Sequence, residues 1–346
     1  MARERGGDEA PAPVTAEKTV GGSPSLLRSV PLLSGPGGSE SLTTVLVAFG
    51  ANVLIAVAKT AAAAVTGSAS LVAEAAHSWA DTGNEIFLLV ANRRSGRPPD
   101  RAHPFGHGRE AYVWSLFAAL GLFVAGAAVS VTYGVLELAH PEPASYFAVG
   151  YAVLAVSFVF EGISFRQSVR QARAEALVMQ RDLIEHVLAT SDPTLRAVFA
   201  EDSAALIGLV IAAVGLGAHQ LTGSVVPDAV GSILVGALLA VVAVVLINRN
   251  RRSLVGEEAD PRVRAALVQA LLDAPEVARV TYLRLEIVGP RMVLLVGAVD
   301  LTGDDSESLL AVRLRALEAK ITASPAVAGA VLTLSAPDDP ALTPEE

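Results

Sequence analysis

Residues 70–85 read SLVAEAAHSWADTGNE, and they place four ionisable side chains in a chain otherwise rich in Ala, Val, Leu and Gly. Glu74, His77, Asp81 and Glu85 follow one another at spacings of three, four and four residues, so on a helix they form one polar stripe. Charged groups inside a membrane-spanning helix are costly, and they usually face a partner or a water-filled path. The stretch therefore predicts a helix in a membrane bundle whose polar stripe meets a cation.

The overall composition is typical of a membrane protein with several spans. Of 346 residues, 52% are hydrophobic, and the mean hydropathy is +0.50, which is too apolar for an ordinary soluble domain. The chain has no cysteine, so disulfides and thiolate metal sites are excluded, and a metal would have to bind His, Asp, Glu, Asn or water. Residues 257–346 contain 8 Lys plus Arg against 15 Asp plus Glu, a net −7, which argues against nucleic-acid binding.

Six apolar segments of about 20 residues, the length that crosses a bilayer, follow an N-terminal tail. The tail, residues 1–40, is rich in Gly, Pro, Ser and Glu, and we expect it to be disordered and cytoplasmic. It lacks the apolar core close behind a basic start that a signal peptide needs. A six-helix transmembrane domain is expected over 41–254, with spans at 43–65, 70–92, 112–136, 145–165, 197–220 and 226–248.

Arginine is confined to alternate connections between these spans. The connections near 66–69, 137–144 and 221–225 contain no Lys or Arg. By the positive-inside rule, this alternation predicts that both termini are cytoplasmic. Without a recognisable targeting signal, and with an Arg- and Ala-rich composition, a bacterial inner (plasma) membrane is the expected location. The arginines are Arg93, Arg94, Arg97, Arg101 and Arg109, then Arg166, Arg170, Arg173, Arg181 and Arg196, then Arg249, Arg251 and Arg252.

The cytoplasmic parts show other patterns. A separate helix is expected over 171–189, ended by Asp192-Pro193. Beyond the sixth span, helical spacing at 261–273 and 306–321 alternates with strand patterns at 277–289, 291–301 and 326–336, the first two strands being joined at Gly289-Pro290. The order αββαβ predicts a small α+β domain of ferredoxin-like type over 255–336, followed by a flexible tail at 337–346.

The second and fifth spans carry the candidate ligands within the membrane. His77 and Asp81 lie one helical turn apart, and imidazole with carboxylate suits Zn²⁺ and other first-row divalent ions. At ~1.5 Å per residue Asp81 lies near mid-membrane, and Glu201 and Asp202 lie at similar depth on an antiparallel span. Three other interpretations stay open: a polar pair that only joins helices, an intramembrane metal-dependent hydrolase with Glu201 or Glu74 as base, and a non-transporting metal-binding scaffold or receptor.

A second constellation lies in the loop after the second span. Asp100, His103 and His107 occur in the pattern DxxHPFGHG, so three metal-ligand types fall within eight residues. They either bind an accessory metal ion or hydrogen-bond the loop to neighbouring helix ends.

Two other pairs of ionisable residues have less specific roles. For Lys59 and Glu161, in the first and fourth spans, ion pairing or helix-end packing is expected rather than direct metal contact. Asp182 and His186 are expected on a solvated helix face.

Three motifs together resemble the signature of the cation diffusion facilitator family, in its HSxADTxN and EDxAA branch. They are AEAAHSWADTGNE at 73–85, DRAHPFGHGREAYVW at 100–114 and EDSAA at 201–205. Further matches are Glu161-Gly162, Asp192-Pro193, Asp228 and LVGEEAD at 254–260, so the resemblance covers about 41–335. It implies a homodimeric antiporter with six spans that exports a divalent metal, zinc by default, in exchange for protons. No cofactor beyond the transported metal is expected.

The resemblance also implies a transport site with ligands from the second and fifth spans. His77, Asp81 and Asp202 match that site, but the usual fourth ligand position holds Val198, which cannot bind metal. Either the site is three-coordinate or a substitute ligand completes it, the candidates being Glu201, Glu74, Asn84 and water.

The resemblance has implications for the cytoplasmic parts as well. In the family, a loop comparable to the one that carries Asp100, His103 and His107 holds an accessory metal. The soluble domain of this chain contains no His or Cys, so we expect it mainly to support dimerisation. If it senses metal, carboxylates such as Asp304, Asp305 or Glu307 would have to bind the ion.

Overall fold

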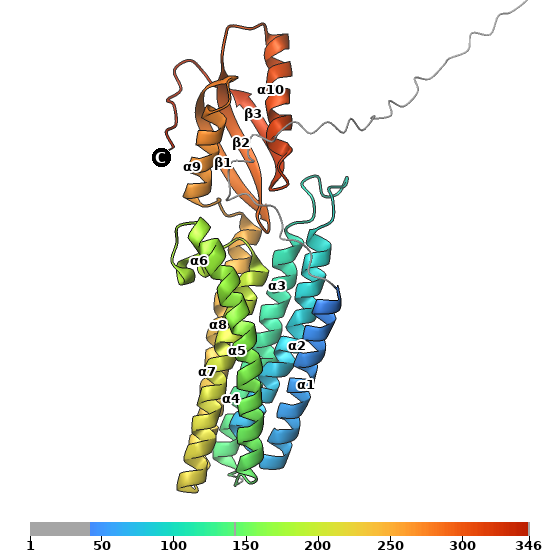
Figure 1. Ribbon diagram of the computed structural model, residues 1–346, viewed down its shortest axis with the longest axis vertical. Helices are drawn as coiled ribbons and strands as arrows, with labels where there is room; N and C mark the ends of the chain where they lie inside the picture. The colour runs from blue at the N-terminus through green and yellow to red at the C-terminus, as the bar shows by residue number, and fades with distance from the viewer. Residues whose placement is uncertain (1–41, 142, 345–346) are drawn as a thin grey trace, which may run out of the picture.

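A bundle of long helices forms one end of the molecule, and a small α+β domain forms the other (Figure 1). The computed structural model describes residues 42–141 and 143–344, and the tail predicted to be disordered over 1–40 lies outside them. The helices of the bundle are α1 (Leu42–Thr66), α2 (Ala69–Ser95), α3 (Glu110–Gly121), η3 (Leu122–Ala128), α4 (Val129–Ala139), α5 (Phe147–Val178), α7 (Pro193–Thr222) and α8 (Val226–Val255).

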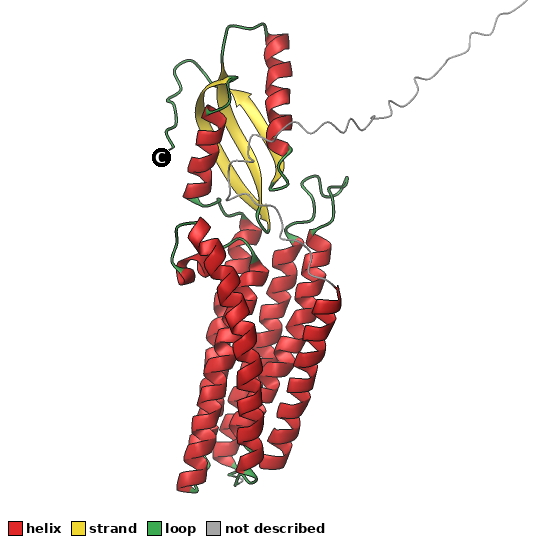
Figure 2. Cartoon of the chain, in the orientation of Figure 1, coloured by secondary structure: helices red, strands yellow, loops and turns green. Residues whose placement is uncertain are grey.

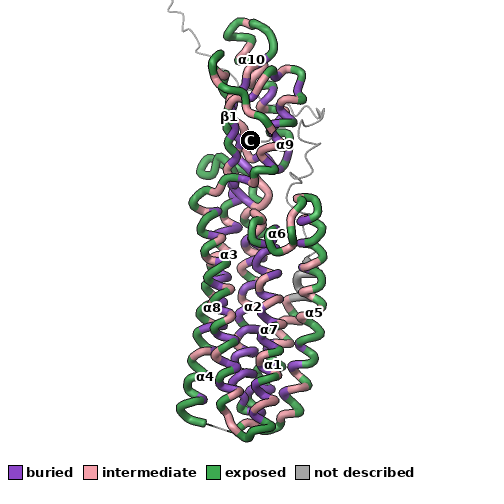
Figure 3. The backbone as a smooth tube through the Cα atoms, turned by 90° about the vertical axis from the view of Figure 1, so that its left-hand side faces the viewer, coloured by how far each residue is buried: buried purple, intermediate pink, exposed green. Residues whose placement is uncertain are grey.

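Five helical segments among the described residues are long and apolar enough to cross a membrane. They match five of the six predicted spans, so the chain is a multi-pass integral membrane protein. Helix α2 has 27 residues and is also long enough to cross a membrane, but its polar stripe makes it less apolar than the five segments. It lies inside the bundle, where burial runs along α2 and α7 (Figure 3). The five segments are Phe49–Thr66, Glu110–Ala139, Phe147–Val178, Pro193–Thr222 and Val226–Val255.

The third predicted span is one continuous helix with a wider, π-helical stretch in its middle. Segment η3 provides this stretch between α3 and α4. It lies against α8 at Gly236, where an added Cβ would sit 2.9 Å from both the Ala127 carbonyl oxygen and the Val131 nitrogen. Glycine therefore allows the two backbones to touch, as small residues commonly do between membrane helices.

The connection between the fourth and fifth spans differs from the expectation. Helix α5 has 32 residues and continues to Val178, because residues 163–178 contain neither Gly nor Pro. The separate helix predicted over 171–189 is therefore wrong: its first half belongs to α5, and α6 (Leu183–Ala189) is a short helix of its own. The solvated face predicted for His186 is also wrong, since its ring is buried with Nε2 3.4 Å from Glu175 Oε2.

The predicted boundary before the fifth span is confirmed. Helix α7 begins at Pro193, where proline costs no hydrogen bond, and Asp192 is its N-cap. The Asp192 carboxylate accepts hydrogen bonds from the Thr194 and Leu195 backbone nitrogens at 3.0 and 3.3 Å.

The soluble domain combines helices with a sheet (Figure 2), and its elements follow the predicted order αββαβ. Its elements are α9 (Pro261–Leu272), β1 (Val277–Gly289), β2 (Met292–Leu301), α10 (Glu307–Thr322) and β3 (Val327–Leu334). They form a three-stranded mixed sheet in the order β1-β2-β3, with β1 antiparallel and β3 parallel to β2. In the tail predicted to be flexible, the Leu342 nitrogen donates to the Val280 carbonyl oxygen at 2.7 Å.

The turn between β1 and β2 touches the end of the bundle that lies next to the soluble domain (Figure 1). An added Cβ on Gly108, just before α3, would lie 2.6 Å from the Val288 carbonyl oxygen. Arg291, at the turn, pairs with Glu175 of α5 at 2.6 Å and with Asp192 at 3.3 Å. These contacts hold the loop that carries Asp100, His103 and His107 beside the sheet.

Candidate functional site

His77 and Asp81 lie side by side on α2 inside the bundle. The His77 ring is fully buried, and its Nε2 lies 3.5 Å from Asp81 Oδ2, without hydrogen-bond geometry. Within the described residues, neither ring nitrogen has a hydrogen-bond partner, and Asp81 Oδ1 has none either. The predicted pair is therefore formed, and its lone pairs remain available to a ligand.

The two adjacent acids of α7 turn toward different helices. Glu201 accepts a hydrogen bond from the Asn84 side-chain amide of α2, whereas both oxygens of Asp202 accept from the Ser164 hydroxyl of α5, at 3.1 and 3.0 Å. Neighbouring residues on a helix point about 100° apart, which accounts for the divergence. Glu201, rather than Asp202, therefore makes the hydrogen bond to the helix that carries His77.

Val198 and Ser164 complete the surroundings of these acids. Val198 is partly buried and packs into an apolar cluster with Leu88 and Leu246. The sequence analysis missed Ser164, although it follows Glu161 by three residues and so shares its face of α5.

Lys59 of α1 lies at the centre of a buried ionic group. Its ammonium is 3.0 Å from Glu74 Oε2 and 4.0 Å from Glu161 Oε1, and both Lys59 and Glu74 are fully buried. The ion pairing predicted for Lys59 and Glu161 is present, with Glu74 as the nearer partner. Nearer the C-terminal end of α2, Asn52 donates to Glu85 Oε1 at 2.6 Å.

Unsatisfied polar atoms gather on α2. Native proteins leave few buried polar groups without a partner, so each one calls for an explanation. Within the described residues, the buried atoms on α2 that lack a hydrogen-bond partner are Glu74 Oε1, His77 Nδ1 and Nε2, Ser78 Oγ, Asp81 Oδ1, Asn84 Oδ1 and Glu85 Oε2. Glu201 Oε1 joins them from α7.

The loop constellation is the more compact of the two. Among the described residues, only Asp100, His103 and His107 form a group of three or more His, Asp or Glu side chains whose ligand atoms all lie within 4.8 Å of one another. His107 Nε2 is 3.0 Å from Asp100 Oδ2, and His103 Nδ1 is 3.2 Å from Asp100 Oδ1. His77, Asp81 and Asp202 do not reach that proximity.

Asp100 organises the loop as well as the cluster. Its Oδ1 accepts hydrogen bonds from the backbone nitrogens of Ala102 and His103 at 2.8 and 2.7 Å. The hydrogen bond with the His107 side chain, followed by the one from the His103 backbone, holds the pKa of the Asp100 carboxyl well below its usual range. Glu110 was not predicted as part of this group. Its Oε1 lies 3.3 Å from His107 Nδ1, three residues earlier in the chain. Both predicted uses of the loop fit this geometry.

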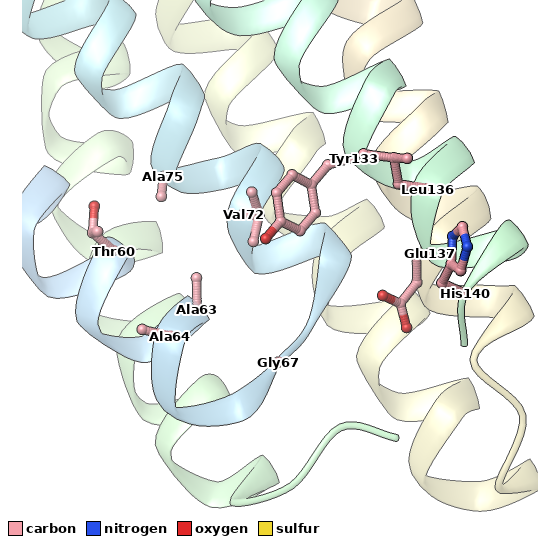
Figure 4. Close-up of a pocket in the computed structure, with 10 residues that line it drawn as sticks. All are labelled: Thr60, Ala63, Ala64, Gly67, Val72, Ala75, Tyr133, Leu136, Glu137 and His140. Atoms are coloured by element: carbon pink, nitrogen blue, oxygen red, sulfur yellow. The ribbon is translucent and has the colours of Figure 1, made fainter. Parts of the chain in front are cut away.

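A cavity of about 620 Å³ opens at the end of the bundle away from the soluble domain. In Figure 4, Tyr133 and Glu137 of α4 extend toward α2 and the turn at Gly67. In the described part of the chain, His77 and Asp81 are not among the residues that line it. The cavity is therefore separate from the candidate ligands.

Comparison with known proteins agrees with the motifs. The model of the cation efflux transmembrane domain matches residues 45–255. The mitochondrial proton-coupled zinc antiporter SLC30A9 of Xenopus laevis is 34% identical over 280 residues, which are 81% of this chain and 49% of the relative. Metal tolerance protein C4 of Arabidopsis thaliana is 34% identical over 233 residues, 67% of this chain and 51% of the relative. This chain thus spans about half the length of these two relatives.

A bacterial relative covers a larger share of its own length. The manganese efflux system protein MneP of Bacillus subtilis is 24% identical over 243 residues, 69% of this chain and 77% of the relative. The resemblance read from the motifs is confirmed by the match over residues 45–255, which takes in both α2 and α7. The chain belongs to the cation efflux family.

Proposed function

We propose that the protein exports a divalent transition-metal cation, zinc by default, in exchange for protons, by alternating access. The observation that carries the proposal is the set of unpartnered nitrogen and oxygen atoms buried on α2 and α7. Inside a membrane such atoms are costly, and polar residues there mark ion pathways. Imidazole and carboxylate are the ligands that Zn²⁺ and its neighbours prefer.

The proposed ligands are His77, Asp81, Asp202 and Glu201. Glu201 takes the role that Val198 cannot fill, and its hydrogen bond to Asn84 supports this because it directs the carboxylate toward α2. Asp202 would leave Ser164 to join the ion. The four groups are more widely spaced than the loop cluster, so binding requires α2, α5 and α7 to approach one another. Such rocking of helices around a central site is the basis of alternating access.

Proton coupling follows from the chemistry of these groups. Imidazole and carboxylates bind a metal ion only when they are deprotonated, so metal binding releases protons. In the inward-open state the site would take up metal, and on the outer side protons would displace it and return inward. The same lone pairs therefore serve both ions in turn.

We also propose that α2, the second predicted span, crosses the membrane and brings the number of spans to six. Its 27 residues correspond to roughly 40 Å of helix, enough to cross a bilayer, and its polar stripe is turned into the bundle. With six spans, the alternating arginine connections put both termini in the cytoplasm. A bacterial inner membrane is the proposed location, and an organellar membrane is the alternative because the Xenopus laevis relative is named as mitochondrial.

Further ligands and partners are part of the proposal. Asp100, His103 and His107 would bind an accessory divalent ion, supported by their mutual distances. The protein would act as a homodimer, with its acidic soluble domain supporting dimerisation and not binding nucleic acid. The relatives are named as an antiporter, an efflux protein and a metal tolerance protein, which favours transport over a hydrolase or a scaffold.

The test is metal-driven proton movement in proteoliposomes, across Zn²⁺, Mn²⁺, Fe²⁺, Co²⁺ and Ni²⁺. Wild type should exchange protons against one or two of these ions, and Asp202→Asn and Glu201→Gln should each reduce the flux by at least tenfold, since each removes a charged ligand. Glu258→Gln, on the surface of the soluble domain, is the control. Tight metal binding without flux of metal or protons in wild type would contradict the proposal.

A further inference from the structure

Glu74 is a candidate ligand by its place in the stripe, but one of its oxygens is bonded to lysine, and the other, which has no hydrogen-bond partner, packs against the backbone of α7. Oε2 accepts a hydrogen bond from Lys59 Nζ at 3.0 Å. Oε1 faces α7 at Gly208, where an added Cβ would lie only 2.5 Å away. The carboxylate is thus enclosed between the ammonium of α1 and the bare backbone of α7.

Lys59 has few alternatives to this contact. An ammonium group with no exposed surface is stable only when paired, because its desolvation costs several kcal/mol. Glu161, the second acid near it, is 4.0 Å away and partly exposed. Glu74 is therefore the main counter-charge of Lys59, and Lys59 in turn repels a divalent cation from the Glu74 carboxylate.

His77 shows the opposite situation one turn further along α2. Both of its nitrogens lack a hydrogen-bond partner within the described residues, whereas Glu74 has a lysine at bonding distance. The two side chains are three residues apart and share one face of the helix. A free Glu74 would accordingly stand next to an ion held by His77.

We propose that Lys59 sets the metal preference of the site as a tethered cation that withholds Glu74 from the ion. The inference rests on the proposed function, and it assigns Lys59 the role of a positioning residue that acts through Glu74. With Glu74 withheld, the ligand set contains one carboxylate fewer beside the imidazole of His77, and a larger share of imidazole suits zinc. With Glu74 released, the set gains an oxygen ligand, and oxygen-rich sites suit Mn²⁺.

The experiment measures Zn²⁺ and Mn²⁺ affinity of the purified full chain in nanodiscs, in an Asp100→Asn background that removes the proposed loop site, by competition with a fluorescent chelator. Lys59→Met should release Glu74 and tighten Mn²⁺ binding relative to Zn²⁺ by about tenfold, the order of change that altered ligand surroundings produce. The double variant Lys59→Met with Glu74→Gln should return the ratio to that of wild type. A lysine with a purely structural role would not yield this reversal.

The double variant keeps the inference testable if Lys59→Met alone fails to fold, because it removes both members of the buried pair. It should bind both metals without loss of affinity, and a marked loss would show that Glu74 is a ligand and overturn the inference. An unchanged Mn²⁺/Zn²⁺ ratio in folded Lys59→Met would overturn it as well. Failure of the proposed function is distinguishable, because wild type itself would then bind neither metal at the membrane site.

Discussion

At the scale of single residues, the chemistry depends on which side chains have partners. Asp202, a match to the family motif, is hydrogen-bonded to Ser164, while Glu201 beside it keeps one oxygen free. Asp100 is held by two backbone nitrogens and approached by two imidazoles. Contacts of a few ångströms thus decide which carboxylate oxygens are hydrogen-bonded within the protein and which keep no partner.

Asp100→Asn tests the loop cluster. The variant should lose the loop-bound zinc ion, because one charged ligand disappears and the turn loses its ionic acceptor. Titration of zinc into the full chain, in an Asp81→Ala background that disables the membrane site, should show about one ion fewer per chain. Arg101→Gln in the same loop is the control, and retention of the ion by Asp100→Asn would contradict metal binding there.

The pH dependence of Asp100 has a defined sign. Its pKa is depressed in the folded protein, mainly by the hydrogen bond with His107. A depressed carboxyl pKa contributes stability that is present above the unfolded-state value and is lost as the pH falls through the lower folded-state value. Thermal unfolding should therefore show a loss of stability as the pH falls below the usual range of an aspartate, while the Asp100 carboxyl of the folded protein is still charged.

At the scale of elements, small residues decide how closely the helices approach. The π-helical stretch η3 and the start of α4 meet α8 at Gly236 with backbone against backbone. In a bilayer, van der Waals packing of this kind is a principal source of helix association, since lipid offers no hydrophobic driving force between helices. The close contact between the third span and α8 thus depends on the missing side chain of Gly236.

Gly236→Ala should destabilise the bundle by about 1–3 kcal/mol, the usual cost of overpacking. An added Cβ would meet main-chain atoms of η3 and α4 that cannot move away easily. Thermal unfolding of the purified chain in detergent would measure the loss. Gly121→Ala is the matched control, because nothing lies within 4 Å of its added Cβ, and equal stability of the two variants would contradict the argument.

At the scale of the whole molecule, the turn between β1 and β2 joins the soluble domain to the bundle. The Arg291 side chain pairs with both Glu175 and Asp192, and its backbone nitrogen donates a hydrogen bond to Ser191 Oγ at 3.1 Å. Tyr112, from the start of α3, is buried in the core of the soluble domain. Helix α7 begins at this junction and carries Glu201 and Asp202, so one helix connects the contacts of the soluble domain to the candidate site.

Arg291→Met should loosen this junction without unfolding the soluble domain. Hydrogen–deuterium exchange should become faster at backbone amides of residues 175–195, because two ion pairs that hold α5 and α7 to the turn are removed. Amides within β1 and β2 should keep their protection. Arg284→Met, which removes an ion pair to Glu258 within the soluble domain, is the control, and unchanged exchange at 175–195 in Arg291→Met would contradict the junction's role.

The sequence by itself determined the membrane class, five of the spans, the αββαβ order and the family, because these depend on hydropathy, periodicity and local motifs. It also predicted that His77 and Asp81 would be neighbours, since i and i+4 positions share a helix face. Only the tertiary structure decided that Glu201 faces α2, that Asp202 binds Ser164 and that Lys59 encloses Glu74. Those outcomes depend on the rotation and approach of helices far apart in the chain, which no local pattern encodes.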